Sequence, residues 1–463
     1  MTRPFPVFAR LVVAAAACVA TTFGVASAQE LKTEKKEVVV KRRADLSDED
    51  LRKQLQQVQE LGLNQGTADN LYAPIKKAGA EVKNLPPDLG PRAFGQITTQ
   101  LKRPDQFAMP WRAGADSEMG KEAAERLHVL STKLRDSLRK SVKAGDVRPD
   151  PEKLVKLLDD PEWTTPEAIP TITQMMQAEN TPIRLLMVDM LSQMKGKQAS
   201  IALAQRAVFD LSPGVREKAI KALAERPSKE YAPVLAYGIR YPWAAAADHA
   251  AEAIVALELN ETVPELVKLL KEPNPNLPVK QDNNNYTITE VVRVNHLCNC
   301  MLCHAPSLSN DDLVRGRVPM PGEDPPPLYY AERTGIFVRA DLTYLRQDFS
   351  VVQPVANAGK WPGNQRYDYV LRTRPLTKQE ITTYQKLEKD GKIPKEYPQQ
   401  GSIVFALKEL TKQDYGTTYE QWNEGVQKLL KSPGGQKYLP QGDQKPLPPP
   451  EEKQEKPEKQ PDR

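Results

Sequence analysis

The chain has 463 residues, of which 27% are charged and 6% aromatic, and its 65 basic residues nearly balance its 60 acidic ones. This length allows two or three domains, and the near-even charge balance argues against a nucleic-acid-binding protein. Forty-one prolines and a mean hydropathy of −0.57 predict long connections and at least one polar tail.

Residues 1–28 have the pattern of a secretory signal peptide. Arg3 and Arg10 give a positive start, an apolar run follows, and Ala26-Ser27-Ala28 is a small-x-small cleavage site. The apolar run is short for a membrane-spanning helix, and no other stretch of the sequence could span a bilayer. We therefore expect cleavage near Ala28, a periplasmic or secreted mature chain, and no membrane span.

Residues 29–119 are predicted to combine helical and irregular chain. Ser47 at an N-cap position, with Asp50 three residues later, forms a capping-box pattern at the start of a helix. Further on, apolar residues at helical spacing predict an amphipathic helix over 120–142. His128 lies beside that apolar stripe, and we expect it to be a packed or half-exposed helix residue and not a ligand.

The middle of the chain, residues 120–272, contains an internal repeat. Short apolar segments begin at Ile169, Ile201, Ala232 and Val263, at nearly equal intervals, and a second helical segment follows each of the first three. Such helical pairs cannot bury both of their apolar faces alone. Neighbouring pairs are therefore predicted to stack into a solenoid.

Two further features recur within this repeat. A hydroxyl residue precedes a proline at Thr165-Pro166, Thr181-Pro182 and Ser212-Pro213, which predicts an N-cap followed by proline at the first helical position. Arg184 and Arg216 occur one repeat period apart, at the start of second helices. His249, in an alanine-rich segment, is expected to serve helix packing and not chemistry.

The segment SPGVREKAIKALAE and the repeat around it resemble the short HEAT-like repeats, over about residues 150–272. The resemblance implies an α-solenoid with a surface on which a protein partner can bind.

The segment 288–322 contains all the cysteines of the predicted mature chain. We expect a helix from Glu290 into the sequence VNHLCNCMLCHAPS, in which Cys298, Cys300 and Cys303 are crowded together. A disulfide framework would spread its cysteines along the chain to join distant segments. The crowding therefore favours local chemistry.

Cys300-Met301-Leu302-Cys303-His304 matches the C-x-x-C-H pattern, and in this stretch the chain is similar to c-type cytochromes. The resemblance implies thioether bonds from Cys300 and Cys303 to one edge of a haem, with His304 as the proximal iron ligand. Haem c is attached outside the cytoplasm, which agrees with the predicted export signal. Met320, in VPMPGED, resembles the ligand methionine of cytochromes c and is a candidate sixth ligand.

His296 is the alternative sixth ligand. On a continuous helix it would lie ~12 Å from His304 along the axis, so it could serve only if the helix breaks between them. Downstream of Met320 the sequence predicts a proline-rich run and a β-ribbon, where a usual cytochrome c domain has a helix. An ordinary cytochrome c domain is therefore not expected.

Two other uses of the cluster stay open. A structural zinc ion could take four ligands from His296, His304 and the three cysteines, although no second ligand pair occurs elsewhere in the sequence. Alternatively, the cluster holds no cofactor and forms a local disulfide, such as one between Cys298 and Cys303. No glycine-rich phosphate loop and no hydrolase or metalloprotease motif occurs, so we do not expect an enzyme.

Residues 323–432 are predicted to form a smaller α+β region. Alternating apolar residues over 336–344 and 367–371 predict two strands of a long antiparallel ribbon, joined by VVQPVANAGKWPGNQ. Helices are expected at 377–390, about 402–412, and 418–431. The sequence LKELTKQDYGTTYEQWNEGV resembles the ending of secreted bacterial HEAT-repeat proteins. Residues 433–463 have the composition of a disordered Pro/Glu/Lys tail.

Together these features predict an exported, mainly α-helical protein. A HEAT-like solenoid leads into the C-x-x-C-H segment and then into the α+β region with its β-ribbon. We expect a scaffold that carries covalently attached haem c and acts in electron transfer or as a redox partner. The alternative is a non-enzymatic protein-interaction scaffold, in which a local disulfide or a structural zinc stabilises the cysteine cluster.

Overall fold

The structure is a computed structural model that describes residues 38–61, 120–146, 148–281, 285–297, 304–306, 315–317, 337–343, 347–359, 361–394 and 396–439. These residues are mainly helical, with a separate antiparallel sheet region. The predicted signal peptide, the chain over 62–119 and most of the predicted tail lie outside them. Among the residues described, no helix combines the length and the apolar composition needed to cross a membrane.

The first described element is the short helix α1 (Asp48–Gln56). Its start confirms the predicted capping box, because the hydroxyl of Ser47 accepts the N–H of Asp50 while the Asp50 carboxylate accepts the N–H of Ser47. Leu51 and Leu55, one turn apart, are fully buried. The helix is therefore held by a narrow apolar stripe that faces the core.

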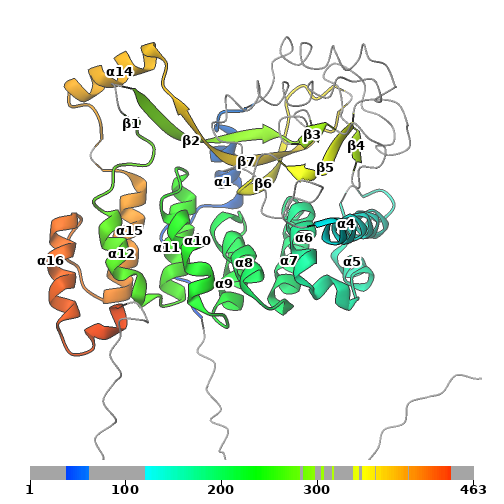
Figure 1. Ribbon diagram of the computed structural model, residues 1–463, viewed down its shortest axis with the longest axis horizontal. Coiled ribbons are helices and arrows are strands. Elements are labelled where there is room, and N and C mark those ends of the chain that lie inside the picture. The colour runs from blue at the N-terminus through cyan, green and yellow to red at the C-terminus, as the bar shows by residue number, and fades with distance from the viewer. Residues whose placement is uncertain are drawn as a thin grey trace, which may run out of the picture. The chain divides into compact units, whose positions relative to one another are not determined.

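The larger part of the described chain is a row of helices that follow one another in chain order (Figure 1). They are α4 (Gly120–Ser141), α5 (Pro151–Leu157), α6 (Ile169–Met176), α7 (Thr181–Gln193), α8 (Lys197–Phe209), α9 (Pro213–Leu223), α10 (Ser228–Ile239), α11 (Ala244–Ala256) and α12 (Val263–Leu269). Short 3-10 turns lie between some of them: η4 (Pro161–Thr164), η5 (Pro166–Ala168) and η6 (Asn260–Thr262). The helix predicted over 120–142 is confirmed as α4.

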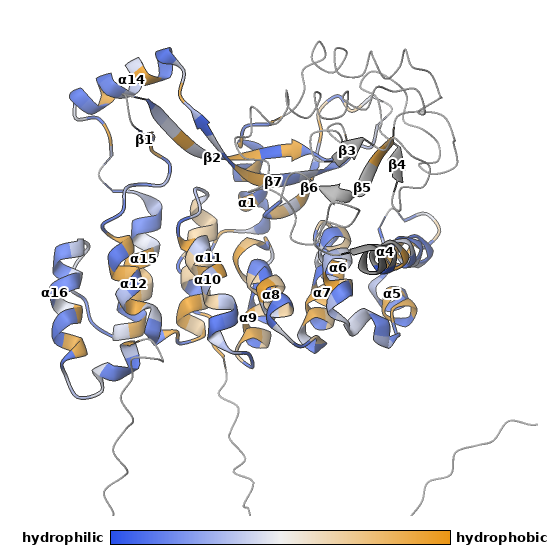
Figure 2. Cartoon of the chain, viewed as in Figure 1, coloured by the Kyte–Doolittle hydropathy of each residue, from blue (hydrophilic) through white to orange (hydrophobic). Residues whose placement is uncertain are grey.

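The repeat in the sequence corresponds to a repeat in the packing. The helices α6 and α7, α8 and α9, and α10 and α11 pack together as pairs. Each helix from α6 to α9 also contacts the helix two places further on, so that equivalent members of successive pairs lie against one another. This arrangement buries apolar residues on both sides of each helix, which explains why α10 and α11 are largely hydrophobic in Figure 2.

The predicted hydroxyl caps are wrong in part. Asn180, and not Thr181, is the N-cap of α7, and its side-chain oxygen accepts the N–H of Ile183 at 3.2 Å. Ser212 and Thr165 are the N-caps of α9 and η5, but neither hydroxyl forms a cap hydrogen bond. The prolines that follow are indeed in the first turn of their helices.

The arginines that recur at the start of α7 and α9 are buried and hold the connection after α8. Nε of Arg184 forms an ion pair with the Asp210 carboxylate at 3.0 Å. The Arg216 guanidinium donates to the backbone carbonyls of Asp210, at 3.0 Å, and Leu211, at 2.8 Å. Both arginines thus reach one loop from two successive helical pairs, which gives their spacing of one repeat period a structural cause.

Two antiparallel sheets follow the helices. In the first, the strand order is β1 (Val279–Lys280), β2 (Tyr286–Asn295), β7 (Asn364–Pro375), β6 (Phe349–Pro354); in the second it is β3 (His304–Pro306), β5 (Phe337–Thr343), β4 (Arg315–Arg317). The helix predicted from Glu290 is wrong, because this residue lies inside β2. The run TITEVVRV is rich in β-branched residues, and its pairing with β7 satisfies the backbone as a strand.

The predicted β-ribbon is correct in its strands and wrong in their pairing. Strands appear at both predicted places, as β5 and β7. However, β5 pairs with β3 and β4, whereas β7 lies between β2 and β6 in the other sheet. Strand β6 occupies part of the stretch that we expected to be connection.

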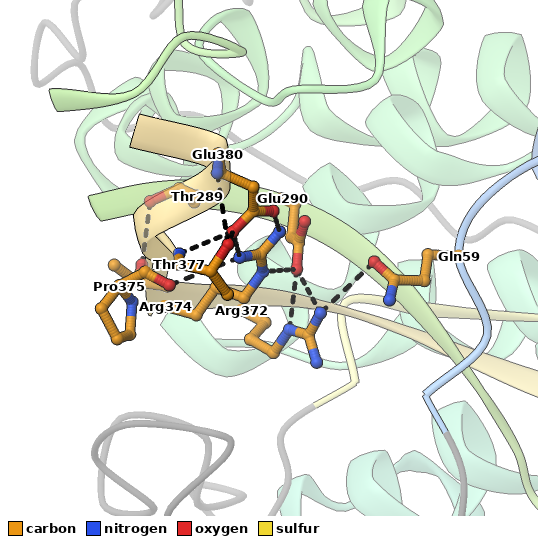
Figure 3. Close-up of polar contacts among 9 residues, drawn as sticks. Gln59, Thr289, Glu290, Arg372, Arg374, Pro375, Thr377 and Glu380 are labelled. Carbon is orange, nitrogen blue, oxygen red and sulfur yellow. Dashed lines mark hydrogen bonds and ion pairs between the residues drawn. The ribbon is translucent and has the colours of Figure 1, made fainter. Parts of the chain in front are cut away.

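A cluster of ion pairs joins the β2–β7 ribbon to helix α14 (Lys378–Lys389), as Figure 3 shows. The carboxylate of Glu290 on β2 accepts from the guanidinium groups of Arg372 and Arg374 on β7. Arg374 also pairs at 2.7 Å with Glu380, which forms a capping box with Thr377 at the start of α14. These contacts explain how α14, which has no buried residue and is largely hydrophilic (Figure 2), is held in place.

The last elements are α15 (Pro398–Thr411), α16 (Tyr419–Leu430) and the 3-10 turn η8 (Gly435–Tyr438). The three helices predicted after residue 376 are confirmed, although α15 begins earlier than expected. In the sequence LKELTKQDYGTTYEQWNEGV, Trp422 is fully buried and its Nε1 donates to the carbonyl of Gly416 at 2.8 Å. Gly416 has a φ of +102°, which favours glycine, and the Tyr415 ring lies edge-on to Trp422. This segment therefore builds the turn between α15 and α16.

The four-stranded sheet shares its core with the helices. Phe349 of β6 stacks on Phe209 of α8 with ring centroids 5.2 Å apart, and on Tyr369 of β7 at 4.7 Å. Trp243, the N-cap of α11, stacks on the same ring at 5.4 Å. The hydroxyl of Tyr369 donates to the carbonyl of Leu55 in α1. Helices, sheet and N-terminal segment thus meet around one aromatic group.

Candidate functional site

The first residues of the predicted Cys/His segment, 288–295, form the second part of strand β2. His296 is the first residue after the strand, and His304 is the first residue of β3, where it pairs with Thr343 of β5. The side chain of His304 is not among those that the structure describes. Cys298, Cys300, Cys303 and Met320 lie outside the described residues altogether. The structure thus describes the point from which the segment starts and the strand that follows the motif.

His296 is fixed to the neighbouring strand β7 through its backbone and its ring. Its backbone N–H donates to the carbonyl of Arg366 at 2.9 Å, which continues the β2–β7 ladder by one residue. Its Nδ1 lies 2.9 Å from a carboxylate oxygen of Asp368. The side chain of His296 is 38% exposed, whereas that of Asp368 is 7% exposed. A buried carboxylate therefore orients a histidine at the surface.

Asp368 is a carboxylate held in place by three neighbours. Its other oxygen, Oδ1, accepts from Nε of Arg366 at 2.8 Å and from the hydroxyl of Ser350 at 2.5 Å. Burial acts to raise the pKa of Asp368, but the charges of Arg366 and His296 and the hydrogen bonds outweigh it and hold the pKa well below its usual range. Asp368 is thus ionised at neutral pH.

This ionisation state decides which nitrogen of His296 carries a proton. An ionised carboxylate only accepts hydrogen bonds, so Nδ1 of His296 must be the donor to Asp368. In the neutral ring, Nε2 then carries the lone pair that can bind a metal. Histidine ligands of metals characteristically donate their second ring nitrogen to a carboxylate in this way, which fixes the tautomer and strengthens the ligand.

The backbone path from His296 to His304 differs from the expected one. The sequence argument against His296 as a sixth ligand assumed a helix that runs through both residues. In the structure, His296 follows strand β2 and His304 begins strand β3, so no continuous helix joins them. The distance of ~12 Å that a helix would impose between them therefore does not apply.

The sequence reading missed the residues that support His296. Strand register places Ser350 of β6 directly opposite Asp368, while His296 extends β2 beside them. Arg366 and Asp368 are two residues apart on β7 and therefore share one face. The sequence does contain one sign of this site. In RYDYVLRTR an aspartate stands between two tyrosines, which indicates a charged side chain within a largely apolar strand. Only the pairing of three strands shows what this acid contacts.

The other two histidines of the chain lie in helices α11 and α4. His249 in α11 is buried, with its Nδ1 2.9 Å from the carbonyl of Val208, so the packing role expected for it is confirmed. His128 lies in α4, and its side chain is outside those described. Among the described residues, no group of three or more His, Cys, Asp or Glu side chains is placed to hold a metal ion.

Comparisons with known proteins do not extend this picture. No protein-family model matches the chain, and neither the curated proteins nor the solved structures include one with significant similarity.

Proposed function

We propose that the chain is an exported helical-repeat scaffold in which Cys300, Cys303 and His304 would hold a c-type haem and His296 would be a second ligand of its iron. The observation that carries the proposal is the hydrogen bond between His296 and Asp368 at the start of the C-x-x-C-H segment. It supports a ligand role for His296, because histidine ligands of metals characteristically donate one ring nitrogen to a carboxylate.

Three residues of the segment would hold the haem. Cys300 and Cys303 would form the two thioether bonds, and His304 would be the proximal ligand. A bound haem supplies one-electron transfer. A second protein ligand would leave no open position at the iron for small molecules, which would favour an electron-transfer role. His296 is preferred over Met320 in this proposal because Asp368 orients its ring.

The helical part would serve as the interaction surface. We interpret the stacked helical pairs from α6 to α11, together with the internal repeat of the sequence, as a HEAT-like α-solenoid. Solenoids of this kind present extended surfaces to proteins. The partner would accordingly be another redox protein that docks on this surface, in the periplasm or outside the cell.

The test is to produce the full chain in a host with haem-c maturation and to examine the denatured protein. The expected result is a retained Soret band and a pyridine haemochrome spectrum, both lost in a variant with C300A and C303A. The folded ferric protein should show a low-spin spectrum. H296A should convert it to high spin, whereas M320A should leave it unchanged. No covalent haem in wild type, or an H296A spectrum equal to wild type, would contradict the proposal.

The same hydrogen bond between His296 and Asp368 favours one alternative, a structural zinc site. A carboxylate that orients His296 is equally typical of zinc ligands, and the three neighbouring thiols could complete a tetrahedral site. In this case the protein is an interaction scaffold without electron transfer. The expected outcome is then one zinc per chain by metal analysis, no retained Soret band, and loss of zinc in H296A.

A further inference from the structure

A small recess lies where the helices meet the four-stranded sheet, and Ser350, which donates to Asp368, is one of its lining residues. It is lined by the α6–α7 connection, by α7, α8 and the loop after α8, by β6, and by Arg52 of α1. Its unfilled space is about 280 Å³, including the part open to solvent at the mouth. Elements from three distant parts of the chain thus enclose one pocket.

The charges in this recess are unbalanced. Arg52, Arg184 and Arg206 line it, and Asp210 is the acidic residue among the lining side chains. The Asp210 carboxylate is already engaged, because both of its oxygens accept from Nε of Arg184 and one of them accepts the backbone N–H of Ser212. Two guanidinium groups, those of Arg52 and Arg206, are left without a carboxylate in the lining.

Of these two guanidinium groups, that of Arg206 costs the folded state more free energy. Arg206 is only 3% exposed, and its Nε is buried and forms no hydrogen bond within the described chain. Burial lowers the pKa of Arg206 to about 10, with Asp210 acting against this shift and Arg184 adding to it. A buried cation with an unsatisfied donor is strongly destabilising unless a counter-charge reaches it.

Arg52 supplies the second positive group at a more accessible position. It is half-buried, and one of its guanidinium nitrogens donates to the carbonyl of Val352 on β6. Burial and the charge of Arg184 lower its pKa. Asp48 lies on the same helix and acts in the opposite sense, and the more distant Arg148 offsets it.

We propose that this recess binds a small inorganic oxyanion of the phosphate or sulfate type. Planar guanidinium groups match the oxygens of such anions and form strong charge-assisted hydrogen bonds with them. The anion would neutralise the positive charges of Arg52 and Arg206. The recess is small, which excludes a nucleotide or another large anion. This inference does not depend on the proposed haem.

The test measures inorganic phosphate and sulfate on the full-length protein. The midpoint of thermal unfolding is recorded as each anion is added, at an ionic strength held constant with sodium gluconate, whose anion is larger. Equilibrium dialysis with labelled phosphate gives the stoichiometry. The expected result is saturable stabilisation and one phosphate per chain.

Arg52→Gln is the decisive variant, because Arg52 is half-buried and its replacement leaves the core intact. It should weaken phosphate binding about tenfold or more, the loss expected for one charge-assisted contact of ~1.5–3 kcal/mol. Arg206→Met should abolish the phosphate-dependent shift while raising the unfolding temperature of the anion-free protein. Arg139→Gln, on the exposed face of α4, removes the same charge elsewhere and should behave like wild type.

Two results would overturn the proposal. One is the absence of saturable phosphate or sulfate binding to the wild-type chain up to about 10 mM. The other is an equal response in wild type, Arg52→Gln and Arg139→Gln, which would mean that any stabilisation is a general salt effect.

Discussion

At the scale of single residues, the buried side chain of His249 is satisfied by a partner that lies far away in the sequence. His249 donates to the carbonyl of Val208, which is in the last turn of α8 and has no partner within its own helix. Burial lowers the pKa of His249 to about 3, with Arg216 contributing in the same direction. The histidine therefore stays neutral in the folded protein while the unfolded chain titrates near 6.5.

This difference predicts a pH dependence of stability. Below pH 6.5 the unfolded chain takes up a proton at His249 that the folded protein does not, down to about pH 3. The unfolding free energy should thus fall as the pH falls through this window, by up to ~1.4 kcal/mol per pH unit from this group. Urea unfolding of wild type and His249→Gln at pH 7, 6 and 5 measures it.

The glutamine variant separates the proton from the hydrogen bond. Its amide can still donate to the Val208 carbonyl, so it should remain close to wild type at pH 7 and lose less stability on acidification. His249→Leu leaves that carbonyl unpaired and should cost ~1–3 kcal/mol at pH 7. If wild type and His249→Gln lose stability in parallel from pH 7 to 5, the assignment of the neutral histidine is wrong.

At the scale of elements, helix starts depend on which side chain reaches the first free N–H groups. The hydroxyl-proline pattern predicts Thr181 as the N-cap of α7, yet Asn180 forms the cap hydrogen bond to Ile183. The backbone enters the helix one residue earlier than the pattern suggests, so Thr181 is already helical. Asparagine is as good a cap as a hydroxyl residue, and the chain uses it.

A matched pair of variants tests this assignment. Asn180→Ala removes the cap and should lower the unfolding free energy by ~1 kcal/mol. Thr181→Ala removes only a long contact to Arg184 and should change it by less than ~0.5 kcal/mol. Chemical unfolding followed by circular dichroism compares the two. If Thr181→Ala lowers the unfolding free energy more than Asn180→Ala does, the N-cap is the hydroxyl of Thr181 and the assignment to Asn180 is wrong.

At the scale of the whole described chain, the four-stranded sheet and the helices share one packed core. Phe349, of which only 1% is exposed, touches Phe209, Trp243 and Tyr369, and so lies between helices α8 and α11 and strand β7. Helix α1 is linked to both parts, by the hydrogen bond from Nε1 of Trp243 to Gln54 and by that from the Tyr369 hydroxyl to the carbonyl of Leu55. A substitution that removes packing at Phe349 should therefore destabilise both the helices and the four-stranded sheet.

Phe349→Ala should lower the unfolding free energy by ~3–5 kcal/mol, because it leaves a cavity in a rigid aromatic group. Phe349→Leu fills most of that space and should cost distinctly less. In both variants the far-ultraviolet signal of the helices and the tryptophan fluorescence should change together on heating. Separate transitions for the two signals would show that the sheet and the helices unfold independently.

How much could be predicted from the sequence follows from the range of the interactions involved. The capping box at Ser47 and Asp50, the helices after residue 376 and the repeat of helical pairs depend on neighbours within a few turns, and local patterns report them. The pairing of β7 with β2 joins segments that lie far apart in the sequence. No local pattern reports such a pairing, and from Glu290 onward the sequence of β2 predicts a helix instead.

The candidate site divides in the same way. The sequence by itself determined that Cys300, Cys303 and His304 match a haem-attachment motif, because that spacing is local. Only the tertiary structure decided that His296 follows a strand and donates to Asp368, a residue 72 positions away. The three arginines of the recess likewise come together only when α1, α7 and α8 pack. Spacing along the chain determines chemistry within one turn, whereas strand register and helix packing determine which distant charges meet.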